Sequence, residues 1–280
     1  MFAIQWFAIF LAAFTTSVWN FRLLSLALLL TAYGIALRNG QLSITAAIPA
    51  VLLLLAAAIA KQRPRRWHYV GHAVFIVLAL ALSLHLFPGF HNPKVFGPER
   101  ITADAVPFTM YLNLDKPLVG FWLLLLFPWI RPVREWRSAL IAGTSTTVIA
   151  TMVCMVLAVA LGMVAWEPKF PAFSWLWVLN NLLLVSFAEE AFFRGYLQGG
   201  ISRMLKQYPY KDALAIGVVA FLFGLSHAAG GWQMVVLASI AGVGYGLAYR
   251  FGGFQAALLS HFGLNAAHFF LFTYPALQPI

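Results

Sequence analysis

The stretch ALIAGTSTTVIATMVCMVLAVALGMVA, residues 139–165, contains no charged side chain and is predominantly apolar. About 20 such residues are enough for a helix to cross the hydrocarbon core of a bilayer. This stretch therefore predicts a membrane-spanning helix. Similar runs recur on both sides of it and predict about eight to ten spans, at roughly 2–19, 21–37, 42–60, 69–87, 117–130, 139–165, 173–205, 211–229, 232–249 and 254–274.

Composition supports the same fold class. Hydrophobic residues make up 62% of the chain and charged residues only 9%, which excludes a soluble globular domain. A net charge of +10 would suggest nucleic-acid binding in a soluble protein, but the cations here fall in short breaks between apolar runs. We therefore expect an all-α, polytopic transmembrane helix bundle whose surroundings are a lipid bilayer, with no nucleic-acid partner. A single cysteine, Cys154, excludes a disulfide framework.

The distribution of the cations predicts the orientation of the bundle. On a ten-span path, five cations fall on one side, and the other side carries twelve: Arg22, Lys61, Arg63, Arg65, Arg66, Arg131, Arg134, Arg137, Arg203, Lys206, Lys211 and Arg250. The positive-inside rule makes the richer side cytoplasmic. We thus expect an integral multi-pass protein of the cell (cytoplasmic) membrane with both termini outside. The break at 88–116 contains four prolines and is expected to be an irregular lid or surface loop.

Three charged residues lie inside one predicted span: Glu189, Glu190 and Arg194. An ionised side chain at the middle of a bilayer costs about 2.5–3.5 kcal/mol on insertion scales, so these residues need partners or a water-filled cavity. Glu190 and Arg194 are four residues apart and can pair on one helix face, whereas Glu189 is rotated by about 100° and can meet another partner. The alternative is an ion-pair cluster with only a structural role.

Later spans add further polar groups at similar depth. His227 lies in FGLSH, residues 223–227, and the pair His261 and Asn265 lies in HFGLN, residues 261–265. We count about 1.5 Å of helix rise per residue from the flanking cytoplasmic cation of each span. The resulting depths in the membrane are roughly 21 Å for Glu189, 24 Å for His227 and 16 Å for His261. They can meet in one buried cavity if the helix that carries Glu189 continues past Gly199 and Gly200. A single histidine in a span is, by itself, more often a packing residue.

The three segments EEAFFRG (189–195), FGLSH and HFGLN resemble the EExxxR, FxxxH and HxxxN motifs of the CPBP family. This family comprises CAAX proteases and bacteriocin-processing, Abi-type intramembrane endopeptidases. The resemblance covers about residues 173–275, inside an expected protease core at 139–280, and no motif is assigned to the helices of residues 1–138. It implies hydrolysis of a peptide bond in a membrane-associated protein or peptide, and it does not identify the substrate.

The resemblance implies catalytic roles for Glu189, His227, His261 and Asn265, with Glu190 and Arg194 in support. Glu189 would take a proton from water that His227 orients, and His261 with Asn265 would donate hydrogen bonds to the oxyanion. This mechanism requires no cofactor. Two histidines and a glutamate are also a possible Zn²⁺ site, although no histidine in the chain is followed by glutamate as in HExxH.

Other classes of protein remain as alternatives. Embedded carboxylates and histidines also form proton relays, as in a proton-coupled membrane transporter, and the same fold can serve as a noncatalytic membrane scaffold or immunity protein. Gly224, Leu225 and Ser226 form a rhomboid-like GLS, with His268 on a later helix, but the expected glycine after the serine is replaced by histidine. Gly242 and Gly246 form GxxxG, which is typical of close helix packing.

Overall fold

The structure is a computed structural model that describes residues 2–18, 21–61, 65–127, 129–130 and 135–278. It is a helical bundle, which confirms the predicted all-α fold class. The first half contains α1 (Phe2–Val18), α2 (Arg22–Arg38), α3 (Ala47–Ile59), α4 (Arg65–Ser83) and α5 (Lys116–Leu126). The second half contains α6 (Trp136–Ala160), α7 (Ser174–Asn180), α8 (Phe187–Glu190), α9 (Gly199–Met204), α10 (Lys211–Leu225) and α11 (Trp232–Leu271).

In the described residues, four helices are long and apolar enough to cross a membrane: Arg66–Ser83, Trp136–Ala160, Ser174–Met204 and Trp232–Leu271. Shorter apolar helices cover Ile4–Val18, Ile44–Ile59 and Lys116–Leu126. The chain is therefore an integral membrane protein. The two last expected spans, 232–249 and 254–274, are joined in α11, but Gly253 (φ 76°, ψ −165°) breaks its helical geometry. Glycine is needed there because other residues rarely adopt a positive φ.

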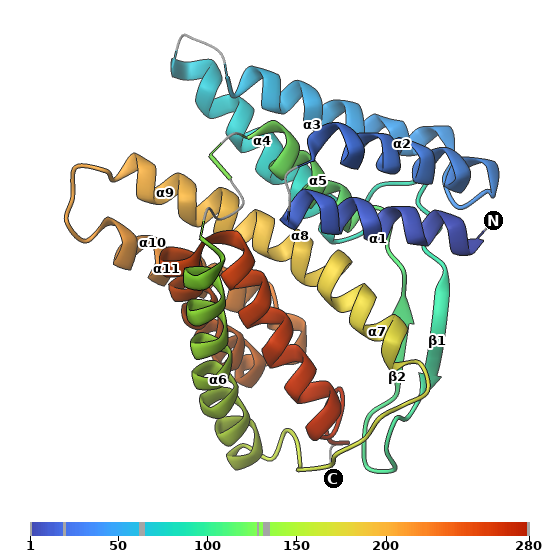
Figure 1. Cartoon of the computed structure of the whole chain (residues 1–280), viewed down its shortest axis with the longest axis vertical. Helices are drawn as coiled ribbons and strands as arrows, with labels where there is room; N and C mark the ends of the chain where they lie inside the picture. The colour runs from blue at the N-terminus through green and yellow to red at the C-terminus, as the bar shows by residue number, and fades with distance from the viewer. Residues whose placement is uncertain (1, 19–20, 62–64, 128, 131–134, 279–280) are drawn as a thin grey trace.

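A long helical rod formed by α7, α8, α9 and the segments between them crosses the molecule obliquely (Figure 1). Helices α1–α5 lie on one side of the rod, and α6, α10 and α11 lie on the other. At the crossing, the buried Phe187 of α8 packs against Phe121 of α5, with ring centroids 5.1 Å apart. On the other side it packs against Phe254 of α11, at 6.3 Å. The rod is thus the central element around which both helix groups pack.

The break at 88–116 is more ordered than the sequence analysis predicted. It contains an antiparallel ribbon of β1 (Lys94–Glu99) and β2 (Phe108–Tyr111), so the expectation of an irregular loop is wrong for this part. The ribbon has a physical reason: Phe96 stacks on Phe173, at a centroid distance of 3.9 Å, and so packs against the segment before α7. Pro98 is accommodated where the pairing register shifts, between Phe96 and Glu99.

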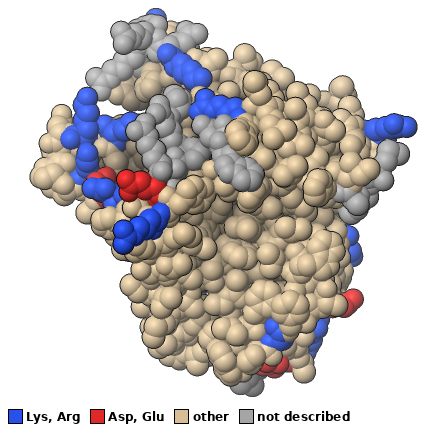
Figure 2. All heavy atoms as spheres, in the orientation of Figure 1, with Lys and Arg blue, Asp and Glu red and all other residues tan. Residues whose placement is uncertain are grey.

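Many of the charged side chains gather at one end of the molecule, and a smaller group lies toward the opposite end. Figure 2 shows Lys and Arg concentrated at its upper left, where Figure 1 places the connection between α9 and α10. At this end Arg250 Nε lies 2.6 Å from Asp212 Oδ2. Three cations used to predict the orientation, Arg63, Arg131 and Arg134, lie outside the described residues. The orientation across the membrane stays a prediction.

Helices α10 and α11 approach each other closely at small residues. A Cβ atom on Gly242 would lie 3.0 Å from the Cα of Ala220, so the GxxxG pair does serve packing at this position. A Cβ atom on Gly224 would lie 2.6 Å from the carbonyl oxygen of Val235 and would also clash with Ser239. Because a backbone atom cannot move aside without moving its helix, Gly224 sets the spacing of these two helices.

We predict that Gly224→Ala destabilises the protein by about 1–3 kcal/mol, the usual cost of overpacking. Gly217→Ala, in the same helix, is the matched control, because a Cβ atom there meets nothing within 4 Å and alanine favours a helix by up to about 1 kcal/mol over glycine. The unfolding temperatures of both purified variants in detergent should be compared with that of the unmodified chain. Equal unfolding temperatures for the two variants would show that the contact does not limit packing.

Candidate active site

The helix that carries the two glutamates is continuous from Ser174 to Met204 and therefore passes Gly199 and Gly200, as the convergence of the site requires. It is not a regular α-helix. Residues Asn181–Ser186 and Ala191–Gln198 form π-helical segments on either side of α8. Such segments widen the turn and are frequent at functional sites. The sequence analysis treated the span as a uniform α-helix and did not predict them.

Glu190 is completely buried and has two partners. Its Oε2 atom lies 3.4 Å from Nε of Arg194, which is also completely buried. Its Oε1 atom lies 2.8 Å from Nδ1 of His261. The pairing expected from the i,i+4 spacing is therefore present, and the same carboxylate also fixes the ring of His261. Glu190 thereby links α8 to α11.

Arg194 is held mainly by aromatic rings. Its guanidinium carbon lies 4.8 Å from the ring centroid of Phe223 and 5.5 Å from that of Tyr245. Tyr245 in turn stacks on His261, with centroids 4.5 Å apart and an interplanar angle of 13°. Within the described residues, none of the guanidinium nitrogens has a hydrogen-bond partner of good geometry. Cation–π contacts and the Glu190 carboxylate thus stabilise this buried charge.

Glu189 points to different partners. Its Oε1 atom accepts a hydrogen bond from Nζ of Lys116, at 2.5 Å, and its Oε2 atom lies 3.8 Å from Nε2 of His261. Lys116 is the first residue of α5, and the buried Asp115 caps this helix by accepting a hydrogen bond from the Lys116 backbone N–H, at 2.9 Å. The adjacent glutamates thus lie in two different environments.

The sequence analysis missed Lys116, which it assigned to a break between spans. The sequence contains one local signal: Asp115 and Pro117 flank the lysine directly before an apolar run, a pattern typical of a helix start. This places Lys116 in the first turn of a span, where its long side chain can reach inward. Nothing in the local sequence predicts that Glu189, 73 residues later, is its partner.

His227, His261 and Asn265 line a common cavity of about 310 Å³, and His268 lines it too. Most of the remaining lining is apolar, with Met155, Leu237 and Leu264 among its members. Glu189 adjoins this group through His261, whose Nε2 atom faces its carboxylate. The structure therefore brings the four residues expected to be catalytic into one neighbourhood.

Hydrogen bonds fix the orientation of two of these residues. Nδ1 of His227 lies 2.9 Å from the carbonyl oxygen of Phe223, a contact that directs Nε2 away from this carbonyl. Asn265 donates a hydrogen bond from Nδ2 to Oδ1 of Asn181, at 3.2 Å. Asn181 is the first residue of a π-helical segment and was also missed by the sequence analysis.

A zinc site and a rhomboid-like serine–histidine pair are the two other site types that the sequence allowed. In the described residues, no group of three or more His, Cys, Asp or Glu side chains is placed to hold a metal ion. Both ring nitrogens of His261 face carboxylates. Ser226 donates from Oγ to the carbonyl oxygen of Phe223, at 2.7 Å, and makes no hydrogen bond with His268 in the described part of the chain. The rhomboid-like pair is therefore not assembled there.

We predict that Arg194→Ala lowers the free energy of unfolding by about 3–5 kcal/mol, because it leaves the buried Glu190 carboxylate without its cation. Lys206→Ala is the control, since Lys206 is exposed between α9 and α10 and surface substitutions change stability by about 0.5 kcal/mol or less. Thermal unfolding of both purified variants measures the difference. A normal unfolding temperature for Arg194→Ala would contradict a structural role for the pair.

Comparison with known proteins agrees with this geometry. Residues 171–267 match the family model described as type II CAAX prenyl endopeptidase Rce1-like. No curated protein and no solved structure matches the chain. The matched region begins just before α7, ends within α11, and contains Glu189, His227, His261 and Asn265. Residues 171–267 are therefore similar to the Rce1-like type II CAAX prenyl endopeptidase family, which is consistent with the CPBP family of intramembrane proteases.

Proposed function

We propose that the chain is an intramembrane endopeptidase that hydrolyses a peptide bond of a membrane-associated protein or peptide, using water activated by Glu189. The observation that carries the proposal is the convergence of a carboxylate, two histidines and an amide at one site. Glu189 Oε2 lies 3.8 Å from His261 Nε2, and His261 shares its cavity with His227 and Asn265. These groups come from α8, from the turn after α10 and from α11, so their convergence depends on the fold.

The proposed reaction gives each of the four residues a role. Oε2 of Glu189 takes a proton from a water molecule oriented by Nε2 of His227, and the oxygen of this water attacks the carbonyl carbon. The carbonyl oxygen becomes an oxyanion, which accepts hydrogen bonds from His261 and from Asn265 Nδ2–H. The tetrahedral intermediate collapses as the C–N bond breaks. Glu189 then returns its proton to the departing amine nitrogen.

The shape and lining of the cavity indicate which part of a substrate it receives. Its walls are mostly apolar, and their side chains come from α6, α10, α11 and the segment after α11. Burial of apolar side chains stabilises a complex by about 25 cal/mol per Å² of apolar surface. We therefore expect apolar residues on the substrate segment that occupies this cavity, which suits a chain that enters from a lipid bilayer.

Lys116 is assigned here a positioning role. Its ammonium group holds Oε1 of Glu189 and leaves Oε2 as the oxygen that faces His261. The lysine side chain is 20% exposed and that of Glu189 only 14%, so little water competes for this ion pair. An unconstrained carboxylate would rotate between several positions. A fixed one keeps the same oxygen toward the reacting water.

We predict that Glu189→Gln abolishes cleavage and preserves the fold, because an amide cannot accept a proton as a carboxylate does. The measurement is mass-spectrometric detection of cleavage products from a peptide library incubated with the purified full-length protein in detergent. Thermal unfolding of the same samples checks the fold. Glu99→Gln is the matched control, since Glu99 is exposed on β1, and it should cleave normally.

Two results would contradict this mechanism. Cleavage by a folded Glu189→Gln protein at the normal rate would exclude Glu189 as the base. Activity that disappears on chelation and returns specifically with Zn²⁺ would support the metal-dependent alternative. Zinc binding to the purified protein should be measured in parallel, because it reports on the metal even when no peptide is cleaved.

For Lys116 we predict that Lys116→Met lowers kcat by roughly a hundredfold, the scale expected when a reacting group is displaced by about 1 Å. Lys116→Arg keeps the positive charge and should recover most of the rate, whereas a purely structural lysine would show no such rescue. Lys94→Met, at an exposed position of β1, serves as control. Equal rates for Lys116→Met and the unmodified chain would remove Lys116 from the site.

A further inference from the structure

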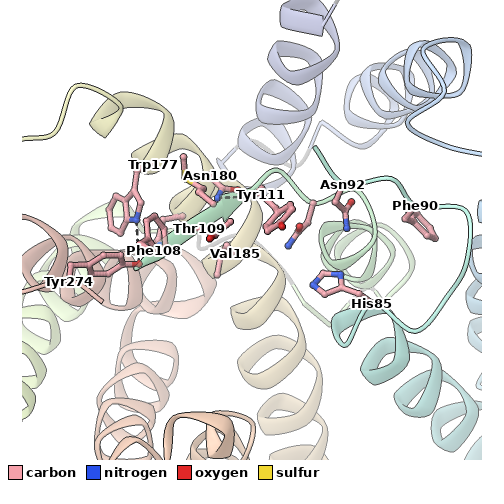
Figure 3. A pocket seen from close by; sticks show the side chains of 13 residues that line it. His85, Phe90, Asn92, Phe108, Thr109, Tyr111, Trp177, Asn180, Val185 and Tyr274 are labelled. Atoms are coloured by element: carbon pink, nitrogen blue, oxygen red, sulfur yellow. Dashed lines mark hydrogen bonds between the residues drawn. The ribbon is translucent and has the colours of Figure 1, made fainter. Parts of the chain in front are cut away.

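A second cavity, of about 480 Å³, lies beside the β-ribbon (Figure 3). Figure 3 shows side chains from β2, from the beginning of the rod and from the region after α4 directed around this space. We infer that this cavity binds an extended, uncharged peptide segment of the protein that is cleaved. This inference rests on the proposed function and names a binding site for the same substrate, separate from the cavity of His227 and His261.

Neighbouring residues of the rod offer a donor and an acceptor to this cavity. Asn181 uses its Oδ1 atom to accept hydrogen bonds from Asn265 and Ser186. Its Nδ2 donors have no acceptor within the described residues. Asn180 donates from Nδ2 to the carbonyl oxygen of Tyr111, at 3.3 Å, and its Oδ1 atom receives no donor from the described part of the chain. A free amide N–H beside a free amide oxygen complements the C=O and N–H of a peptide unit.

The β-ribbon offers a second means of binding an extended chain. All four residues of β2, Phe108–Tyr111, line the cavity. In the described residues the sheet has only two strands, so β2 pairs with β1 along one edge and has no strand along the other. A free strand edge binds an extended peptide through main-chain hydrogen bonds. The ribbon and the two asparagines together can therefore recognise a peptide by its backbone.

The lining also indicates an uncharged occupant. No Asp, Glu, Lys or Arg lines this cavity among the described residues. The side chain of His85 does line it, but its Nδ1 atom is engaged by the buried Asp115, at 2.6 Å. A sugar would be the main alternative, because aromatic rings also line the cavity. However, Trp177 is only 2% exposed and stacks against Phe269, at 4.0 Å, so it offers no open face for a sugar ring.

Two polar connections join this cavity to the catalytic residues. Asn181, which lines it, holds Asn265. On the other side, His85 contacts Asp115, which caps the helix that begins with Lys116 and thereby presents this lysine to Glu189. A peptide that contacts Asn181 would therefore be separated from Asn265 by one side chain. The second cavity is thus placed to hold a substrate segment next to the bond that is cleaved.

The test measures binding without requiring cleavage. The probe is a mixture of N-acetylated, C-amidated hexapeptides composed of uncharged residues, incubated with the full-length Glu189→Gln protein in detergent. Peptides retained by the protein are identified by mass spectrometry. We expect Thr109→Val, which removes one hydroxyl from the lining, and Asn180→Leu each to lower the affinity of the retained peptides about tenfold, the effect of one lost hydrogen bond.

Three controls make the result specific. Asn39→Leu is an equivalent substitution at an exposed position outside the cavity and should bind peptides normally. Thermal unfolding shows whether Asn180→Leu disturbs the fold through its lost bond to Tyr111, and Thr109→Val, with nearly the same side-chain shape, provides the second variant. Retained peptides carrying a single N-methylated backbone amide should bind about tenfold more weakly, because recognition uses backbone N–H groups.

The outcomes separate this inference from the proposed function. Binding that depends on Asn180 and Thr109, with no peptide cleaved by the unmodified chain, would retain the binding site and contradict the protease. Cleavage with an unchanged KM in both variants would support the protease and contradict the binding site. The inference is overturned if no peptide is retained, if all variants bind equally, or if maltohexaose binds in an Asn180-dependent manner while the peptides do not.

Discussion

The burial of the Glu190 carboxylate is the constraint on which the rest of the site depends. A charge without solvent must find its partners inside the protein, because the cost of leaving it unpaired is several kcal/mol. Arg194 satisfies it from the same helix and His261 from α11. The ring of His261 is consequently fixed between two glutamates. The aromatic rings around Arg194 then determine how closely α10 and α11 can approach the rod.

The two adjacent glutamates illustrate how one short segment serves two purposes. The side chain of Glu190 is 0% exposed and that of Glu189 is 14% exposed. In a helix, neighbouring residues point about 100° apart, so one carboxylate can face the packed interior while the other faces a polar site. The π-helical turns on both sides adjust the direction of the helix around them. Glu190 is thereby held in the packed interior, while its neighbour Glu189 is available for the proposed chemistry.

Much of the fold and part of the site could be predicted from the sequence. The apolar runs predicted the helices because burial in lipid requires a long, nearly uncharged segment, and Glu189, Glu190 and Arg194 were conspicuous because charge is costly there. Lys116 could not be paired with Glu189, nor Asn181 with Asn265, because these contacts depend on how distant helices pack. The ribbon was missed because its stability comes from Phe96 packing on Phe173, a contact that local sequence does not determine.

The i,i+4 position of Glu190 and Arg194 also bears on biosynthesis. Both residues enter the bilayer on the same helix, so this span carries its own counter-ion while later spans are still being made. Lys116 precedes Glu189 by 73 residues and is synthesised before it, whereas His261 follows Glu190 by 71 residues. The nascent chain can therefore neutralise its embedded carboxylates early. The residues of the proposed site are all present only after α11 has been made.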